Sequence, residues 1–470
     1  MGTINSAFNI ISQGLDAEQS ALNIVANNVA NANTPGYTEE QPTWSENQPL
    51  EVNGVSYGAG VTETGAASVR DRVLAERLDQ QQQLASASGS RLTALNTLQA
   101  LFTPDSGSSS STAGDIGSDL TSFFGSFSSL EANPTDNALR QQVLSTAATL
   151  AGDVSNAAAN LNSQRAALDR EAAGVTSQVN SLTSAIAGLN QQIQSTSPNG
   201  DAGTLEDQRQ QDLSKLSQLI GINQVTTENN GLSITTTSGQ LLVSEGSSFQ
   251  LTTGSLGGVT HFFVGTTDIT GSLAGGGGEL GGLLTARDED IPGVLSSLDQ
   301  LAYSVSTQVN TLNNAGTDLA GDNSNAGNIF SQPTQVAGSA AQMSVVMTDP
   351  NHIAAAGTGQ GTGDNSNATA MANLGSQAIV NGQNPTDYYS NFVTTLGSTV
   401  SMVQTENTAQ SASVTQLQTQ NDALSSVNLN DEASSMTTLE RSYQAASQVF
   451  AMLNTLMASA LNLGDQTTVS

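Results

Sequence analysis

The two ends of the chain carry the same apolar spacing, in alternating steps of three and four residues. The first of these seams is broken only at Glu18, and the second is followed by Gly464, a residue suited to ending a helix. A helix with such a narrow apolar seam needs a facing helix, so we expect the terminal helices to pair with each other and with further copies. The seam positions are Ile4, Phe8, Ile11, Leu15, Leu22, Val25 and Val29 near the start, and Met436, Leu439, Tyr443, Ala446, Phe450, Leu453, Met457 and Ala460 near the end.

The segment after the first seam predicts an abrupt end to the helix. Asn31 and Asn33 close a stretch rich in asparagine, a residue that favours helix caps and left-handed backbone. Pro35 cannot continue a helix, and Gly36, which precedes Tyr37, tolerates a positive φ. We therefore expect a helix stop followed by a tight turn.

These residues closely resemble the N-terminal signature of the bacterial flagellar axial proteins, which include the rod, hook and hook-associated families. Residues 427–432 and 439–446 look like the matching C-terminal signature. In that superfamily the two terminal helices pack in the innermost shell of a hollow helical tube. Spacing alone leaves a bundle closed within one monomer equally open, and the resemblance favours pairing in an assembly. It places the assembly interface at the large seam residues and at the turn with Asn31, Asn33, Pro35, Gly36 and Tyr37. Without partners, both ends are expected to be largely disordered in the monomer.

Between the ends, the spacing predicts a mainly α fold, an elongated helical bundle with an inserted β-domain. A 3-4 pattern over 150–193 indicates one long helix or two collinear ones, and further helices are expected near 72–101, 292–314 and 385–424. From residue 222 the period changes to two, and Asn229-Asn230-Gly231 is a strong hairpin signal.

The expected domain organisation follows these changes of period. Residues 1–60 and 425–470 are assigned to the two halves of an inner coiled-coil domain. The helical bundle domain takes 61–221, 286–330 and 376–424. A small β-domain is inserted at 222–285, and 331–375 is expected to be a loop-rich connection with short strands.

Segments 205–209, 216–221 and 278–288 resemble the hook-associated FlgK family more than the simple hook and rod proteins, which are largely β-rich in their middle. The resemblance implies a structural subunit at the junction between hook and filament, outside the cell. Its implied partners are the hook protein, a second hook-associated protein, copies of itself and an export chaperone on the C-terminal helix. Type III export without a cleavable signal peptide is also implied, and the first cation of the chain, Arg70, comes too late for a secretory signal.

Charge excludes several functions. The chain has 11 Lys and Arg against 41 Asp and Glu, a net charge of −30. Nucleic-acid binding needs clustered cations, so neither it nor an anionic membrane surface is expected. We expect no membrane insertion either, because no window approaches the apolar length of a spanning helix. The absence of Cys removes thiolate chemistry and Cys-ligated metals.

No catalytic, cofactor or metal site is expected. Residues 276–281 match G-x-G-x-x-G but lie in a glycine run without a βαβ unit. Residues 322–333 have the cadence of a calcium loop but place Pro333 where a bidentate Glu is needed. His261 and His352 have no second His or Cys nearby. We therefore predict a protein that is not an enzyme. The alternatives are another axial subunit of the hook or rod, or a secreted coiled-coil binding module or adhesin.

Overall fold

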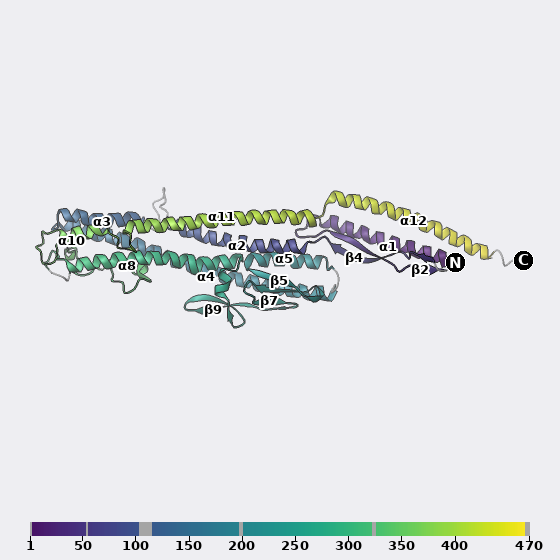
Figure 1. Cartoon of the computed structure of the whole chain (residues 1–470), viewed down its shortest axis with the longest axis horizontal. Helices are drawn as coiled ribbons and strands as arrows, with labels where there is room; N and C mark the ends of the chain where they lie inside the picture. The colour runs from purple at the N-terminus through teal and green to yellow at the C-terminus, as the bar shows by residue number, and fades with distance from the viewer. Residues whose placement is uncertain (1, 53–54, 103–114, 197–200, 322–325, 466–470) are drawn as a thin grey trace.

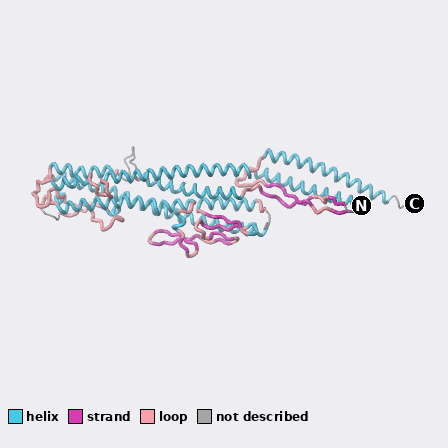
Figure 2. The backbone as a smooth tube through the Cα atoms, in the orientation of Figure 1, coloured by secondary structure: helices cyan, strands magenta, loops and turns pink. Residues whose placement is uncertain are grey.

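The computed structural model describes the whole chain except residues 1, 53–54, 103–114, 197–200, 322–325 and 466–470. The molecule is a long rod of helices, and its two termini lie together at one end (Figure 1). A small group of strands lies along one side of the helical body (Figure 2). The predicted class, mainly α with an inserted β-domain and paired terminal helices, is therefore confirmed.

Residues 1–69 and 427–470, which we call the terminal module, form one end of the rod. Helices α1 (Gly2–Asn31) and α12 (Leu429–Asp465) run side by side (Figure 1). Directly after α1 the chain forms a ribbon of four strands. In it, β1 (Glu40–Glu46) pairs antiparallel with β4 (Val61–Ser68), and β2 (Leu50–Val52) pairs antiparallel with β3 (Val55–Tyr57). Sequence analysis missed these strands, because β1 and β4 are mostly exposed or half-buried and lack a clean alternation.

The body is built on long helices, of which α4 (Asn137–Thr196) is the longest, with 60 residues in one unbroken element. At 1.5 Å per residue it is about 90 Å long. The alternative of two collinear helices is therefore wrong. Helices α8 (Ile291–Ala315) and α11 (Pro385–Ser425) agree with the expected positions, as does α2 (Arg72–Ala100). Helix α5 (Thr204–Leu219) packs beside α2 and α4.

Helix α3 (Ile116–Ala132) was not predicted, because Ser and Gly dilute its apolar pattern. Its aromatic residues nevertheless form the centre of the body at the end away from the termini. Phe123 is fully buried, and its ring centroid lies 5.4 Å from that of Phe127 and 5.3 Å from that of Phe330. Packing of α3 against α4, α10 (Ser366–Leu374) and α11, which the local sequence does not show, buries these rings and holds the helix in place.

The inserted β-domain consists of two antiparallel sheets, in the orders β5-β6-β7-β8 and β11-β10-β9. The predicted hairpin is confirmed as β5–β6, with Asn230 at φ 57° in its loop. The domain is held on α4 by side-chain amides, since Asn190 Nδ2 donates to Leu232 O at 2.8 Å and Asn180 Nδ2 to Leu251 O at 2.8 Å. The strands are β5 (Ile222–Thr226), β6 (Leu232–Thr236), β7 (Leu241–Ser244), β8 (Ser247–Ser248), β9 (Leu251–Leu256), β10 (Val259–Val264) and β11 (Thr267–Asp268).

The described part of 331–375 contains short helices and isolated β-bridges, so the expected short strands are wrong. These helices are α9 (Ser339–Gln342) and α10 (Ser366–Leu374). Side chains of α8 take the place of a strand ladder. Asn313 Oδ1 accepts from the backbone N–H of Ala354 at 2.9 Å, and Asn313 Nδ2 donates to His352 O at 3.2 Å. A backbone satisfied by amide side chains does not need a neighbouring strand.

The glycine run connects α6 (Thr270–Ala274) to α7 (Gly278–Thr285), so the G-x-G-x-x-G match does not follow a strand. Its glycines allow close packing instead. A Cβ on Gly282 would lie 2.1 Å from Ala87 O in α2, and Gly278, at φ +71°, would place one 2.4 Å from the backbone N of Ile220. Such close approaches require glycine. They explain the glycine residues at these positions by packing, with no need for a bound nucleotide.

Candidate assembly interface

The terminal helices meet along the predicted seams. The rings of Phe8 and Phe450 lie with their centroids 4.6 Å apart, and Val25 is 4% exposed. Val29 and Tyr443, by contrast, are exposed, at 40% and 36%. The side chain of Ile4 lies outside the described part of the structure. The remaining interface candidates in the two helices, Ile11, Leu15, Leu22, Leu439, Leu453 and Met457, are half-buried.

The best-buried positions of α1 include residues that sequence analysis did not select. Ala17, Ala21 and Asn28 are 5%, 0% and 1% exposed. Helix α1 lies against α12 on one side and against β1 and β4 on another, and small side chains let these elements approach closely. The apolar spacing in the sequence is carried by large residues, and an alanine between them gives no signal of its own burial.

A second apolar stripe on α12 was also missed. Val449, Met452 and Leu456 are 40%, 59% and 59% exposed, while Phe450 of the seam contacts Phe8. The three residues follow the same steps of three and four as the seam but lie on a different side of the helix. Exposed apolar side chains grouped on one side of a helix are typical of surfaces that contact another protein, so this stripe is a candidate interaction surface.

Asn28 organises the turn after α1. Its Oδ1 accepts from the Tyr37 hydroxyl at 2.8 Å and from the backbone N of Glu40 at 3.1 Å. Its Nδ2 donates to Glu40 O at 2.9 Å and to Glu432 Oε1 at 2.8 Å. Burial, together with the negative charge of Glu40, Asp207, Glu432 and Glu39, raises the pKa of Tyr37 to about 12. One amide thus connects the helix stop, the ribbon and the start of α12.

The other residues of the turn have the geometry that their types predict. Gly36 has φ +75°, and Gln211 of α5 donates its Nε2 to Pro35 O at 2.9 Å. Asn31 Nδ2 donates to Asn27 Oδ1 at 2.9 Å, and Asn33 is exposed. The turn therefore ends α1 and docks the chain on the body.

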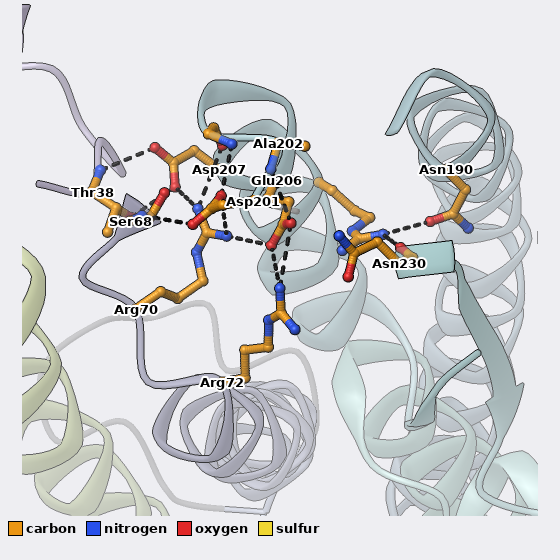
Figure 3. Close-up of polar contacts among 12 residues, drawn as sticks. Thr38, Ser68, Arg70, Arg72, Asn190, Asp201, Ala202, Glu206, Asp207 and Asn230 are labelled. Carbon is orange, nitrogen blue, oxygen red and sulfur yellow. Dashed lines mark hydrogen bonds and ion pairs between the residues drawn. The ribbon is translucent and has the colours of Figure 1, made fainter. Parts of the chain in front are cut away.

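A network of charged side chains joins the terminal module to the body (Figure 3). The backbone N of Thr38 donates to Asp207 Oδ2 at 3.0 Å, and its hydroxyl to Oδ1 at 2.7 Å. Arg70, which follows β4, donates to Asp207 Oδ1 at 2.5 Å and forms an ion pair with Glu206. Arg72 at the start of α2 also pairs with Glu206, at 3.0 Å. We call these five residues the joint network.

Three side chains of the joint network are largely buried, whereas that of Arg72 is 55% exposed. The side chains of Glu206, Asp207 and Arg70 are 3%, 8% and 11% exposed. At the same place, Asp201 accepts from the backbone N of Ser68 at 2.6 Å. Sequence analysis missed these partners because Arg70 and Glu206 are 136 positions apart, and no local pattern brings them together.

No cluster of three or more His, Asp or Glu residues with metal-binding geometry occurs in the described part of the chain. Within the same residues, no helix is long and apolar enough to cross a membrane. The described geometry consists of paired helices, an exposed apolar stripe and a charged joint between the terminal module and the body.

Comparison with known proteins gives matches over nearly the whole chain. The model of the flagellar hook-associated protein FlgK helical domain matches residues 105–330, and that of the flagella basal body rod protein matches 8–38. Flagellar hook-associated protein 1 of Escherichia coli K12 is 24% identical, over 98% of this chain and 100% of its own. The protein of that name from Bacillus subtilis 168 is 26% identical, over 96% of each chain.

The fold has a solved counterpart. The structure of the flagellar hook junction protein FlgK from Burkholderia pseudomallei matches with a TM-score of 0.65 at 20% identity, over 75% of this chain and 100% of that chain. At this identity the match establishes a shared arrangement of helices and strands.

Proposed function

Because this chain belongs to the family of flagellar hook-associated protein FlgK, we propose that it is a structural subunit of the bacterial flagellum at the junction between hook and filament. The observation that carries this proposal is the terminal module, in which α1 and α12 pair through Phe8 and Phe450 and still leave a second apolar stripe open. A helix pair with such a stripe is complete only when another subunit covers it.

The stripe also indicates how copies assemble. We propose that a different surface of the neighbouring copy covers it, so that the contact joins unlike surfaces of the two copies. A contact between unlike surfaces repeats around an axis and builds rings or helical tubes. The elongated body continues the rod from the end of the terminal module that lies away from the termini (Figure 1). The proposed role is mechanical, and the residues of the terminal module perform it by contacting other subunits.

The partners follow from the position in the flagellum. On one side the subunit contacts the hook protein, and on the other a second hook-associated protein that leads to the filament. Copies of the chain fill the layer between them. An export chaperone is proposed to cover the apolar residues of α12 before assembly, when Phe450, Leu453 and Met457 would otherwise favour aggregation.

Deletion of the gene in the source bacterium tests the proposal. We expect electron microscopy to show hooks without filaments, and the filament protein to accumulate in the medium. Restoration of filaments by the intact gene on a plasmid is the control. Normal filaments in the deletion strain would contradict the junction role and favour a secreted adhesin with coiled-coil ends.

A further inference from the structure

The terminal module has almost no positive charge. Residues 1–69 and 427–470 together contain seven plus four, or 11, Asp and Glu, and Arg441 is their one Lys or Arg. Arg441 lies in α12, is exposed, and forms no ion pair with any residue that the structure describes. If copies of this module surround one axis, this arginine is the cation that each copy can offer to the carboxylates of its neighbour.

A hollow of about 490 Å³ opens between α1, β1 and the first turns of α12. Its lining includes three carboxylates, those of Glu39, Glu40 and Glu432. The indole of Trp44, which is 47% exposed, and the side chain of Leu439 supply apolar walls. A planar cation beside an aromatic face and several carboxylates gains from both cation–π attraction and charge-assisted hydrogen bonds. The chemistry of the hollow therefore fits a guanidinium group.

Glu432 gives independent support for a ligand. The residue is only 6% exposed, and its Oε1 is occupied by Asn28 Nδ2 at 2.8 Å. Its Oε2 has no hydrogen-bond or ion-pair partner among the described residues, although the residue lines the hollow. Burial, and next the nearby Glu39 and Asp431, raise the pKa of Glu432. The open oxygen of this largely buried carboxylate would be stabilised by a cation placed in the hollow.

Arg441 of the same chain cannot fill this role. It lies nine positions after Glu432 in one continuous helix, which is about 13 Å along the axis. That distance exceeds the reach of the side chain. Seen down the helix, Arg441 instead borders the exposed stripe of Val449, Met452 and Leu456, where we place a neighbouring subunit.

Building on the proposed assembly, we propose that Arg441 of one copy inserts into the hollow between Glu39, Glu432 and Trp44 of the adjacent copy. Each copy then offers an arginine on one side and a hollow on the other, a head-to-tail contact that repeats around the tube. The apolar stripe holds neighbouring copies together, and this charge pair sets the register between them. A displaced arginine would lose its partners and leave the carboxylates unpaired.

Charge reversal tests the pairing. In the deletion strain, we expect plasmids carrying Arg441→Glu or Glu39→Arg to give few filaments and to release filament protein into the medium. The double variant should regain filaments, because it restores the pair with exchanged signs. Arg170→Glu, at an exposed arginine of α4 in the body, is the matched control and should behave as wild type. Circular dichroism and melting of the purified variants exclude loss of folding.

Cross-linking gives a second readout, which the absence of Cys in the chain makes specific. With Gln41→Cys at the rim of the hollow and Ala445→Cys, at an exposed position one turn after Arg441 on α12, a short bis-maleimide should yield dimers and higher ladders in isolated flagella. Each single variant should stay monomeric. If Arg441→Glu supports normal filaments and the cysteine pair gives no ladder, this inference is overturned while the junction role stands. Normal filaments in the deletion strain itself would overturn both.

Discussion

Phe8 of α1 and Phe450 of α12 stack with their ring centroids 4.6 Å apart, at opposite ends of the chain, yet both side chains remain half-buried. An aromatic pair of this kind normally contributes about 1 kcal/mol beyond the area it buries. Besides this half-buried pair, the apolar residues that α1 buries fully are the small Ala17, Ala21 and Val25. We therefore expect contacts with other subunits to complete the packing of the terminal module.

We expect hydrogen exchange on the isolated monomer to show weak protection of residues 5–30 and strong protection of α4. Helix α4 contributes many fully buried residues to the body, whereas α1 relies on one partner helix and a short ribbon. In assembled flagella the protection of 5–30 should rise. Protection of that segment in the monomer equal to that of α4 would contradict the dependence on assembly.

Met452→Glu should prevent assembly without destabilising the monomer. The side chain is 59% exposed, so its replacement changes the free energy of unfolding by no more than about 0.5 kcal/mol. A carboxylate on the stripe would have to be desolvated at the subunit contact. Denaturant unfolding and filament counts in the deletion strain measure the two effects, with Gln444→Glu, elsewhere on the exposed surface of α12, as the control. Normal filaments with Met452→Glu would show that the stripe is not covered.

Arg70→Met should destabilise the docking of the terminal module on the body. It leaves the buried carboxylates of Glu206 and Asp207 without their principal cation, and removal of one member of a buried pair typically costs about 3 to 5 kcal/mol. Arg77→Met is the comparison, because Arg77 is exposed and forms no ion pair among the described residues. Urea unfolding would check both, and equal midpoints for the two variants would count against the joint network.

Asp79 should make stability depend on pH. Its side chain is 1% exposed, Oδ2 accepts from Gln210 and Gln224 at 2.9 Å, and burial raises its pKa to about 6. Because the folded state holds this proton more tightly than the unfolded state, stability falls as the pH rises from about 4 to about 6, by about 3 kcal/mol in total. Asp79→Asn should remove that part of the slope.

The comparison for Asp79→Asn is the difference in urea midpoint between variant and wild type at each pH, since other carboxyl groups titrate in both proteins. Among these, burial and the neighbouring Asp153 raise the pKa of Asp119 to about 7. A difference between variant and wild type that does not change between pH 4 and pH 6 would rule out titration of Asp79 in this range.

Deletion of residues 436–470 should abolish capture by the proposed export chaperone. The deletion removes both the seam and the exposed stripe of α12, which offer the apolar side chains that such a partner would cover. Affinity for the purified chaperone can be measured by calorimetry, with Phe450→Ala in the full chain as a milder variant. An unchanged affinity after the deletion would refute the assignment to this helix.

Local sequence determined the long elements of this protein. The 3-4 spacing placed α4, α8, α11 and the terminal helices, and Asn229-Asn230-Gly231 placed the β5–β6 hairpin, because each signal lies within the segment that it shapes. The helix stop and tight turn at Pro35 and Gly36 were determined in the same way, by backbone preferences of single residues. Pairing of the terminal helices followed from seams that no single helix can bury.

Tertiary structure alone decided the rest, because these features depend on partners far away in the chain. In the sequence Asn28 is one of several asparagines near a helix end. Only the fold brings its amide to Glu432, 404 positions later, as a hydrogen-bond donor. In the sequence Arg70 has no acidic partner nearby except Asp71. Only the packing of α5 places Glu206 and Asp207 beside it. Ala17 and Ala21 matter only because α12 and the ribbon approach them. Long-range burial and charge pairing leave no periodic signal in the sequence, and they decide which surfaces of the terminal module remain open for assembly.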